Sequence, residues 1–275
     1  MFSVIIVCYN NDEYLTTAID AVLGQDYSEI ELIVADDCSR EFDRDKYFNY
    51  IKNGNRGNIK QFAVYSNTEN YGTVKNINTA LKKCSGKYIK VTSADDSLYD
   101  SHTLSNAAQS LDKSSCGLVI ADVEECDSQL SPVRKYESCF YRKMNSLSAE
   151  AIFKRLCIHN DIHASSVFYS ADFLAKYGYF DESYRLLEDW PKWLEVTSKG
   201  GHPDYFSFFA EKYRTNVGSG TSINKFYLAD KNRVLNSVII PSKNRLGFFY
   251  YTASRASFAF VNSIFIRKLY GLLFR

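Results

Sequence analysis

The chain has 275 residues, of which 45% are hydrophobic and only four are proline, so it can form one large apolar core or two fused subdomains. This composition excludes a disordered or low-complexity chain. The formal net charge of +1 is unevenly distributed, because residues 231–275 hold eight basic and no acidic side chains, whereas residues 1–230 hold 25 basic and 32 acidic ones. The sequence therefore consists of an acidic body followed by a basic C-terminal segment.

The predicted secondary structure begins with a strand over residues 3–8, an apolar run that ends in the polar residues Tyr9 and Asn10. Apolar residues at a spacing of about 3.6 over residues 13–23 then predict an amphipathic helix. The alternation of strand and helix continues as far as residue 96. Consecutive strand–helix–strand units predict a parallel sheet and hence an α/β fold.

Two acidic pairs stand at the ends of two of these predicted strands, Asp36-Asp37 and Asp95-Asp96. One such pair alone is an ordinary turn or helix N-cap, because Asp is common in both. In an open α/β sheet, however, ligands bind beyond the carboxyl ends of the strands. Carboxylates at that edge suit hard cations that also bind substrate phosphates. Together the two pairs predict a site for a metal ion and a nucleotide diphosphate.

Several motifs, in the same order along the chain, resemble those of family 2 glycosyltransferases of the GT-A fold. They are Ser3-Val4-Ile5-Ile6-Val7-Cys8-Tyr9-Asn10, Asp36-Asp37-Cys38-Ser39, the trio Asn70, Gly72 and Asn78, Gly86-Lys87-Tyr88-Ile89, Ser93-Ala94-Asp95-Asp96, Gly178-Tyr179-Phe180-Asp181-Glu182 and Glu188-Asp189-Trp190. The resemblance extends over roughly residues 2–222 and is closest in the first half. It implies a mostly parallel central sheet flanked by helices, with a helical C-terminal tail.

The resemblance divides the chain into a donor-binding subdomain, residues 1–125, an acceptor-binding subdomain, residues 126–222, and a basic aromatic helical extension, residues 223–275. It implies an inverting transfer of a hexosyl or N-acetylhexosaminyl group from a UDP-sugar to a hydroxyl of a glycan or lipid-linked glycan, in bacterial surface polysaccharide synthesis. It also implies a divalent cation, Mn²⁺ or Mg²⁺, which neutralises charge on the leaving diphosphate.

On the donor side, the resemblance assigns Asp96 to the metal and Asp95 to the ribose or sugar of the donor. Asp37 corresponds to the carboxylate that accepts the uracil N3–H, with Tyr9 and Asn10 near the base.

Asn78 and Lys75 are further donor-site candidates by resemblance, although both also fit as solvent-facing helix residues. Ser93 stands where the family usually has the first acid of its metal motif, which leaves the metal mainly on Asp96. Many members have a histidine where Asn216 stands. That histidine can add a metal ligand, so its absence leaves open whether the metal has a third protein ligand here.

Inverting transfer requires one carboxylate, opposite the leaving group, that takes the proton of the attacking hydroxyl. The resemblance assigns this catalytic role to Asp189, with Glu188 as the alternative base or as its support. Asp189 also suits a helix start, because Pro191 fits the first turn. His163 is expected to touch the diphosphate or the acceptor. A zinc site that includes His163 is disfavoured, because no second cysteine lies at a short ligand spacing.

The basic C-terminal segment interleaves aromatic and basic residues, which fits an interfacial helix on an anionic leaflet or a helix packed on the core. Its longest uncharged stretch, residues 256–266, is shorter than the roughly 20 residues that span a bilayer. Nucleic acid is not an expected partner. Seven cysteines without CxxC pairing and an N-terminus without a signal-peptide pattern predict a cytoplasmic protein, with peripheral contact at the inner face of the cytoplasmic membrane.

Two other functions compete with glycosyl transfer. A sugar-nucleotide-binding protein without turnover would not need Asp37, Asp95, Asp96 and Asp189 together. A nucleotidyltransferase would carry a glycine-rich, basic phosphate loop after the first strand, and the residues after Tyr9 do not form one. Enzymatic sugar transfer is therefore the favoured hypothesis.

Overall fold

The sheet is built around the first strand, whose apolar side chains pack against helices on both of its faces. The computed structural model describes residues 1–136, 139–215, 217 and 225–273. The strands of this part of the chain are β1 (Phe2–Cys8), β2 (Ile30–Asp36), β3 (Ile59–Ser66), β4 (Tyr88–Ser93), β5 (Ser97–Leu98), β6 (Leu118–Cys126), β7 (Pro132–Tyr136), β8 (Val167–Ser170) and β9 (Asp204–Arg214).

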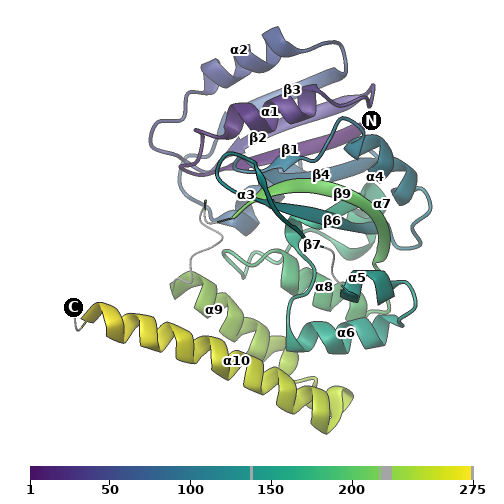
Figure 1. Ribbon diagram of the computed structural model, residues 1–275, viewed down its shortest axis with the longest axis vertical. Helices are drawn as coiled ribbons and strands as arrows, with labels where there is room; N and C mark the ends of the chain where they lie inside the picture. Colours follow the sequence, from purple (N-terminus) through teal and green to yellow (C-terminus); the bar gives the residue numbers. More distant parts are fainter. Residues whose placement is uncertain (137–138, 216, 218–224, 274–275) are drawn as a thin grey trace.

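The helices alternate with these strands in the first half and dominate the second half (Figure 1). They are α1 (Leu15–Leu23), α2 (Arg44–Gly54), α3 (Thr73–Leu81), α4 (Thr103–Leu111), α5 (Cys139–Met144), α6 (Ala149–Ile158), η1 (Ala164–Ser166), α7 (Ala171–Tyr177), α8 (Asp189–Ser198), α9 (Lys225–Val234), η3 (Leu235–Ile239) and α10 (Lys243–Leu273).

The order of strands in the sheet is β3-β2-β1-β4-β8-β6-β9-β5, and β7 pairs with β6. Pairing is parallel from β3 to β4, as the strand–helix alternation predicts. Beyond β4 the sheet is mixed, because β8 runs antiparallel to both of its neighbours while β6 and β9 are parallel. The α/β fold is confirmed. The predicted subdomain boundary at residue 125 falls near the end of β6, so both halves share one sheet.

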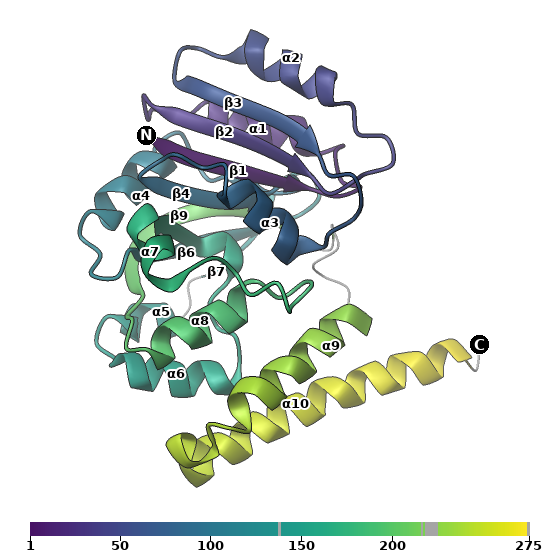
Figure 2. The same cartoon turned by 180° about the vertical axis from the view of Figure 1, so that it is seen from behind.

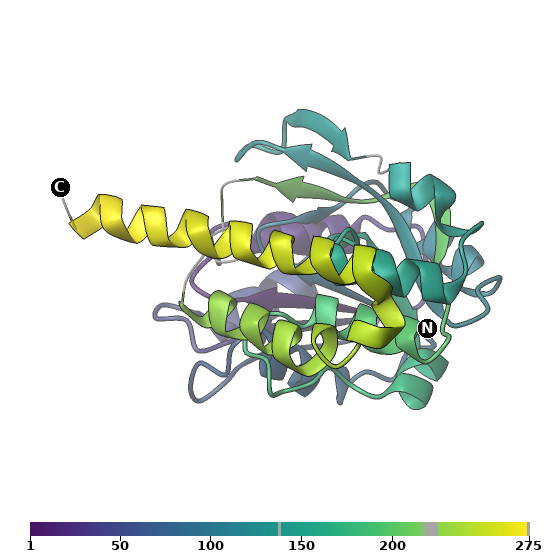
Figure 3. The ribbon, with the colours of Figure 1, turned by 90° about the horizontal axis from the view of Figure 1, so that it is seen from below.

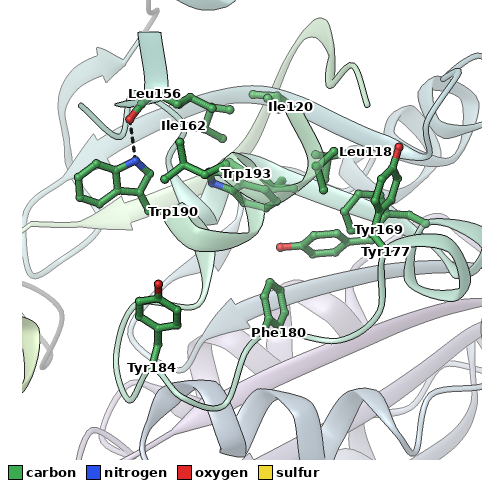
Figure 4. Packing of buried hydrophobic residues seen from close by; sticks show 14 of the residues in the cluster. Leu118, Ile120, Leu156, Ile162, Tyr169, Tyr177, Phe180, Tyr184, Trp190 and Trp193 are labelled. Atoms are coloured by element: carbon green, nitrogen blue, oxygen red, sulfur yellow. Dashed lines mark hydrogen bonds between the residues drawn. The ribbon is translucent and has the colours of Figure 1, made fainter. Parts of the chain in front are cut away.

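Two apolar cores cover the two faces of the sheet. Leu15 and Ile19 of α1 pack with Val4 and Ile6 on one face. On the other face α3 packs together with α6, α7 and α8, and Figures 1 and 2 show α1 and α3 on opposite sides. The second core is rich in aromatic side chains, and in it the indole Nε1 of Trp190 donates to the carbonyl of Leu156 at 2.8 Å (Figure 4).

The C-terminal helices lie against the second half of the chain, and α10 extends past α9 (Figure 3). Leu246 and Phe258 of α10 are buried in the second core, whereas Phe248 and Phe249 are exposed. Helix α10 therefore contributes some side chains to the core and exposes others to solvent. Among the described residues, no helix combines the length and apolar content needed to cross a membrane. The predicted boundary at residue 222 lies outside the described residues.

Candidate active site

A cavity of about 600 Å³ opens at the carboxyl ends of β1, β2 and β4, where the two acidic pairs were predicted to gather. Both halves of the chain contribute to its wall. The residues that line it include Tyr9, Asp37, Gly72, Ser93, Arg185 and Glu188. The predicted donor edge and one member of the predicted acceptor pair therefore face the same space.

Asp37 organises the loop that precedes α3. Its carboxylate accepts from the amide Nδ2 of Asn67 at 3.0 Å and from the backbone N–H groups of Tyr71 at 2.9 Å and Gly72 at 2.8 Å. Gly72 has a φ of 83°, which favours glycine. A Cβ there would lie 2.7 Å from Cγ of Arg185, so the loop and the acceptor half approach closely.

The other predicted donor residues lie at different depths. Tyr9 lines the cavity and is exposed. Asn10, at a φ of 52°, donates its N–H to Ser39 Oγ at 2.7 Å, which joins the ends of β1 and β2. Asn78 is buried away from the cavity lining, where its Nδ2 donates to the carbonyl of Phe180 at 2.8 Å and its Oδ1 accepts from the N–H of Phe180 at 3.0 Å. Asn78 thus joins α3 to the Phe180 segment.

Asp95 and Asp96 follow β4 and sit beside Arg214, which sequence reasoning did not single out. Asp95 accepts from Nδ2 of Asn11 at 3.2 Å and from Ser93 Oγ. Asp96 is buried and accepts from the backbone N–H of Arg214 at 2.9 Å, while the Arg214 guanidinium donates to the Asp95 carbonyl. Burial, followed by the charges of Glu211 and Asp95, raises the pKa of the Asp96 carboxyl well above its ordinary value.

This concentration of negative charge fits a hard cation that keeps water and phosphate ligands, because Mg²⁺ commonly binds through one or two carboxylates plus substrate phosphates. Within the described ranges, no group of three or more His, Cys, Asp and Glu side chains converges on a metal position. Asn216, where many members have histidine, lies outside the described residues. Asp96, the predicted metal ligand, is 2% exposed, and neither Asp95 nor Asp96 is among the residues that line the cavity.

Glu188 and Asp189 stand where α8 begins. Glu188 lines the cavity, and burial, with the charges of Asp189 and Asp230, raises its pKa to about 8. Asp189 accepts from the N–H of Trp190 at 2.6 Å and from Nδ2 of Asn160 at 2.7 Å. Burial raises the pKa of Asp189 too, but these hydrogen bonds favour its charged form. The predicted helix start at this position is confirmed.

His163 packs its ring against Tyr213, with ring centroids 4.5 Å apart, and its Nδ1 accepts from the N–H of Ser165 at 3.3 Å. Burial and the nearby charge of Lys90 lower the pKa of His163 to about 4, so its ring is neutral at neutral pH. The neighbouring residues Ala164 and Ser165 line the cavity.

Arg185, Asp230 and Asn160 also shape the site, and sequence reasoning missed them. Arg185 Nη2 donates to Asn70 Oδ1 at 2.6 Å, which connects the segment before α8 to the loop before α3. Arg185 lies three positions before the Glu188-Asp189 motif, and this proximity was the feature of the sequence that could have indicated its place in the site. Asp230 belongs to α9 and Asn160 to the loop after α6, and no local pattern connects them with that motif.

Comparison with known proteins identifies the family. The family model described as "Glycosyl transferase family 2" matches residues 3–178. An uncharacterized glycosyltransferase of Rickettsia typhi is 29% identical over 203 residues, which are 72% of this chain and 60% of that protein. The Escherichia coli UDP-Glc:alpha-D-GlcNAc-diphosphoundecaprenol beta-1,3-glucosyltransferase WfaP is 25% identical over 256 residues, which are 92% of each chain. The chain thus spans less than two thirds of the Rickettsia protein but most of WfaP.

Solved structures agree on the fold. Staphylococcus aureus TarS 1-349 in complex with UDP-GlcNAc has a TM-score of 0.63 at 20% identity, covering 86% of this chain and 66% of that one. The mannosyltransferase PcManGT from Pyrobaculum calidifontis, in complex with GDP-Man and Mn²⁺, has a TM-score of 0.58 at 15% identity, covering 100% of this chain and 80% of that one. The family match covers more than half of the chain and the architecture is that of GT-A enzymes, so the chain belongs to glycosyl transferase family 2.

Proposed function

We propose that the protein transfers a hexosyl or N-acetylhexosaminyl group from a UDP-sugar to a hydroxyl of a glycan acceptor, with inversion at the anomeric carbon. The observation that carries the proposal is the shared cavity, which is lined by Asp37 and Ser93 of the predicted donor edge and by Glu188 of the predicted acid pair. Similarity to TarS, crystallised with UDP-GlcNAc, and to WfaP, named for UDP-Glc, supports a UDP-linked donor.

At the donor end, Asp37 and Tyr9 hold the base of the nucleotide. Asp37 is already fixed by three hydrogen bonds from its own chain, so it offers a remaining lone pair in a defined direction. Asp95 orients the ribose or sugar, and Asp96 would hold Mn²⁺ or Mg²⁺. When bound, the cation neutralises the charge that collects on the leaving diphosphate.

At the acceptor end, the Glu188-Asp189 pair handles the proton. Because burial raises the pKa of Glu188 to about 8, Glu188 keeps a proton at neutral pH, while the hydrogen bonds from Trp190 and Asn160 favour the charged form of Asp189. The acceptor oxygen attacks the anomeric carbon, the bond to the diphosphate oxygen breaks, and the hydroxyl proton moves to Asp189. Glu188 is the second candidate base, favoured by its position in the cavity wall.

The acceptor is a glycan carried on a lipid diphosphate, in the synthesis of a bacterial surface polysaccharide. Similarity to WfaP, whose name specifies a diphosphoundecaprenol acceptor, supports this class. The exposed Phe248 and Phe249, with the exposed basic residues Lys243 and Arg255 of α10, would hold the protein peripherally on the inner face of the cytoplasmic membrane. The reaction would then take place in the cytoplasm.

The donor, metal and stereochemistry are tested together with a panel of UDP- and GDP-sugars, with Mn²⁺, Mg²⁺ or EDTA. We expect metal-dependent transfer from a UDP-sugar and an inverted product by NMR. Asp96→Ala abolishes metal-dependent transfer, whereas Asp37→Ala weakens UDP binding even without metal, because three backbone and amide donors also lose their acceptor. Full activity in EDTA, or a retained anomeric configuration, contradicts the proposal.

A further inference from the structure

The segment that leads into the Glu188-Asp189 pair has no regular secondary structure, so its backbone amides need partners outside helix and sheet. One carboxylate supplies them. Oδ2 of Asp230 accepts from the N–H of Arg185 at 3.0 Å, of Leu186 at 2.6 Å and of Leu187 at 3.1 Å. Oδ1 of Asp230 also accepts from the N–H of Arg185, at 3.2 Å.

Asp230 belongs to α9 and is 4% exposed. Successive backbone N–H groups that converge on one anion form a concave anion site, and such charge-assisted hydrogen bonds are stronger than neutral ones. The neighbouring residue Lys231 is also buried and fixes α9 from another direction, with its ammonium 5.7 Å from the Trp190 ring centroid and 5.1 Å from that of Phe258. Through Lys231, the helix that carries Asp230 contacts Trp190 of α8 and Phe258 of α10.

The segment bound by Asp230 forms one wall of the cavity. Arg185, Leu186, Leu187 and Glu188 all line it. Arg185 also reaches the donor loop, since its Nη2 donates to Asn70 Oδ1 at 2.6 Å and its carbonyl accepts from the N–H of Val74 at 3.3 Å. A shift of this segment would move the acid pair and the donor loop relative to each other.

We propose that Asp230 is a positioning residue of the transfer reaction, which holds residues 185–187 so that the Glu188-Asp189 pair stands correctly at the acceptor side of the cavity. The inference rests on the proposed function, because it takes this acid pair to receive the acceptor proton. It also makes α9 a part of the active site, although α9 follows the region covered by the family match.

The charge of Asp230 predicts an effect on the pH dependence of the reaction, which a residue with a purely structural role would not have. The charged and titratable groups around the Glu188-Asp189 pair are Asp230 and Tyr227 of α9, Tyr169 of β8 and Arg185, which lines the same cavity as Glu188. Among them, Asp230 adds negative charge that raises the pKa of Glu188. Removing that charge should shift the ionisation of Glu188 to lower pH.

The test compares Asp230→Asn, which keeps the size but removes the charge, with Asp230→Glu, which keeps the charge, and with Asp172→Asn, an exposed acid of α7, as the control. We expect Asp230→Asn to lower kcat by about 10²-fold, the scale of a misplaced catalytic group, with UDP affinity within a few fold. The alkaline inflection of its pH–rate profile should move to lower pH, and hydrogen exchange should accelerate at residues 185–187. Asp230→Glu should recover part of kcat.

Parental kcat together with an unchanged pH profile in Asp230→Asn overturns the inference, as does loss of UDP binding in both Asp230 variants, which would make Asp230 a folding residue. Neither result touches the proposed function. That proposal fails instead if the parental protein binds UDP but transfers no sugar from any donor.

Discussion

Glu188 and Asp189 are adjacent in sequence, yet their side chains meet different surroundings because α8 begins at Asp189. Glu188 faces the cavity, whereas Asp189 is bound by its own helix terminus and by Asn160. Two carboxyl groups whose pKa values are pushed apart can divide acid and base roles between them. The proposed roles, with Glu188 protonated and Asp189 as the base, can therefore be tested separately.

We expect Asp189→Asn to lower kcat by about 10²-fold or more, the scale of a general base, while donor affinity is retained. Glu188→Gln should keep activity at neutral pH, because Glu188 is protonated below its pKa of about 8, and should abolish the inflection of the pH–rate profile near that pH. Steady-state kinetics from pH 6 to pH 10 measure both effects. The reverse pattern, with Glu188→Gln inactive and Asp189→Asn active, would make Glu188 the base.

At the scale of elements, the loop before α3 is the place where the first half of the chain meets the segment before α8. Asp37, which follows β2, accepts a hydrogen bond from Gly72 of this loop. Arg185, which precedes α8, donates one to Asn70 of the same loop. Gly72 allows the contact because it adopts a positive φ and has no Cβ to meet Arg185. The close approach of the Arg185 segment to this loop therefore depends on Gly72.

Gly72→Ala should destabilise the protein by about 1–3 kcal/mol through backbone strain and should also weaken UDP binding several-fold, because its Cβ would lie 2.9 Å from the Arg185 carbonyl oxygen. Gly200→Ala is the matched control, since Gly200 has the same φ of +83° with nothing within 4 Å of its Cβ position. Urea unfolding measures the cost of backbone strain in both variants, and UDP titration measures the effect of the contact with Arg185. Equal UDP affinity in the two variants would show that the Arg185 contact is unimportant.

At the scale of the whole molecule, α10 both completes the core and presents an apolar surface. Phe258 is 2% exposed and stacks on Trp190 with ring centroids 5.5 Å apart, and Arg245 pairs with Glu150 of α6. In contrast, Phe248 and Phe249 are 86% and 72% exposed. The same helix therefore buries some of its aromatic side chains and exposes others.

We expect Phe258→Ala to lower the free energy of unfolding by about 3–5 kcal/mol, the usual cost of truncating a buried Phe. Replacing Phe248 and Phe249 by Ser should leave stability nearly unchanged but reduce binding to vesicles that contain anionic lipid. Chemical denaturation and vesicle sedimentation measure the two effects. Vesicle binding equal to that of the parental chain in the double variant would remove the support for a membrane role of α10.

The sequence alone determined much of the fold. Apolar runs and helical periodicity up to residue 96 predicted the parallel half of the sheet, because these patterns reflect burial on one or both faces of a local element. The acidic pairs at the ends of β2 and β4 predicted the edge where the cavity lies, because parallel strands place their carboxyl ends together.

Only the tertiary structure decided how the site is held together. Arg185 meets Asn70 across 115 positions of sequence, Arg214 meets Asp96 across 118, and Asp230 binds the Arg185 amide across 45. Such contacts carry no local period or spacing. They arise when segments distant in sequence pack together: β9 brings Arg214 to Asp96, and α9 brings Asp230 to the segment that precedes Glu188.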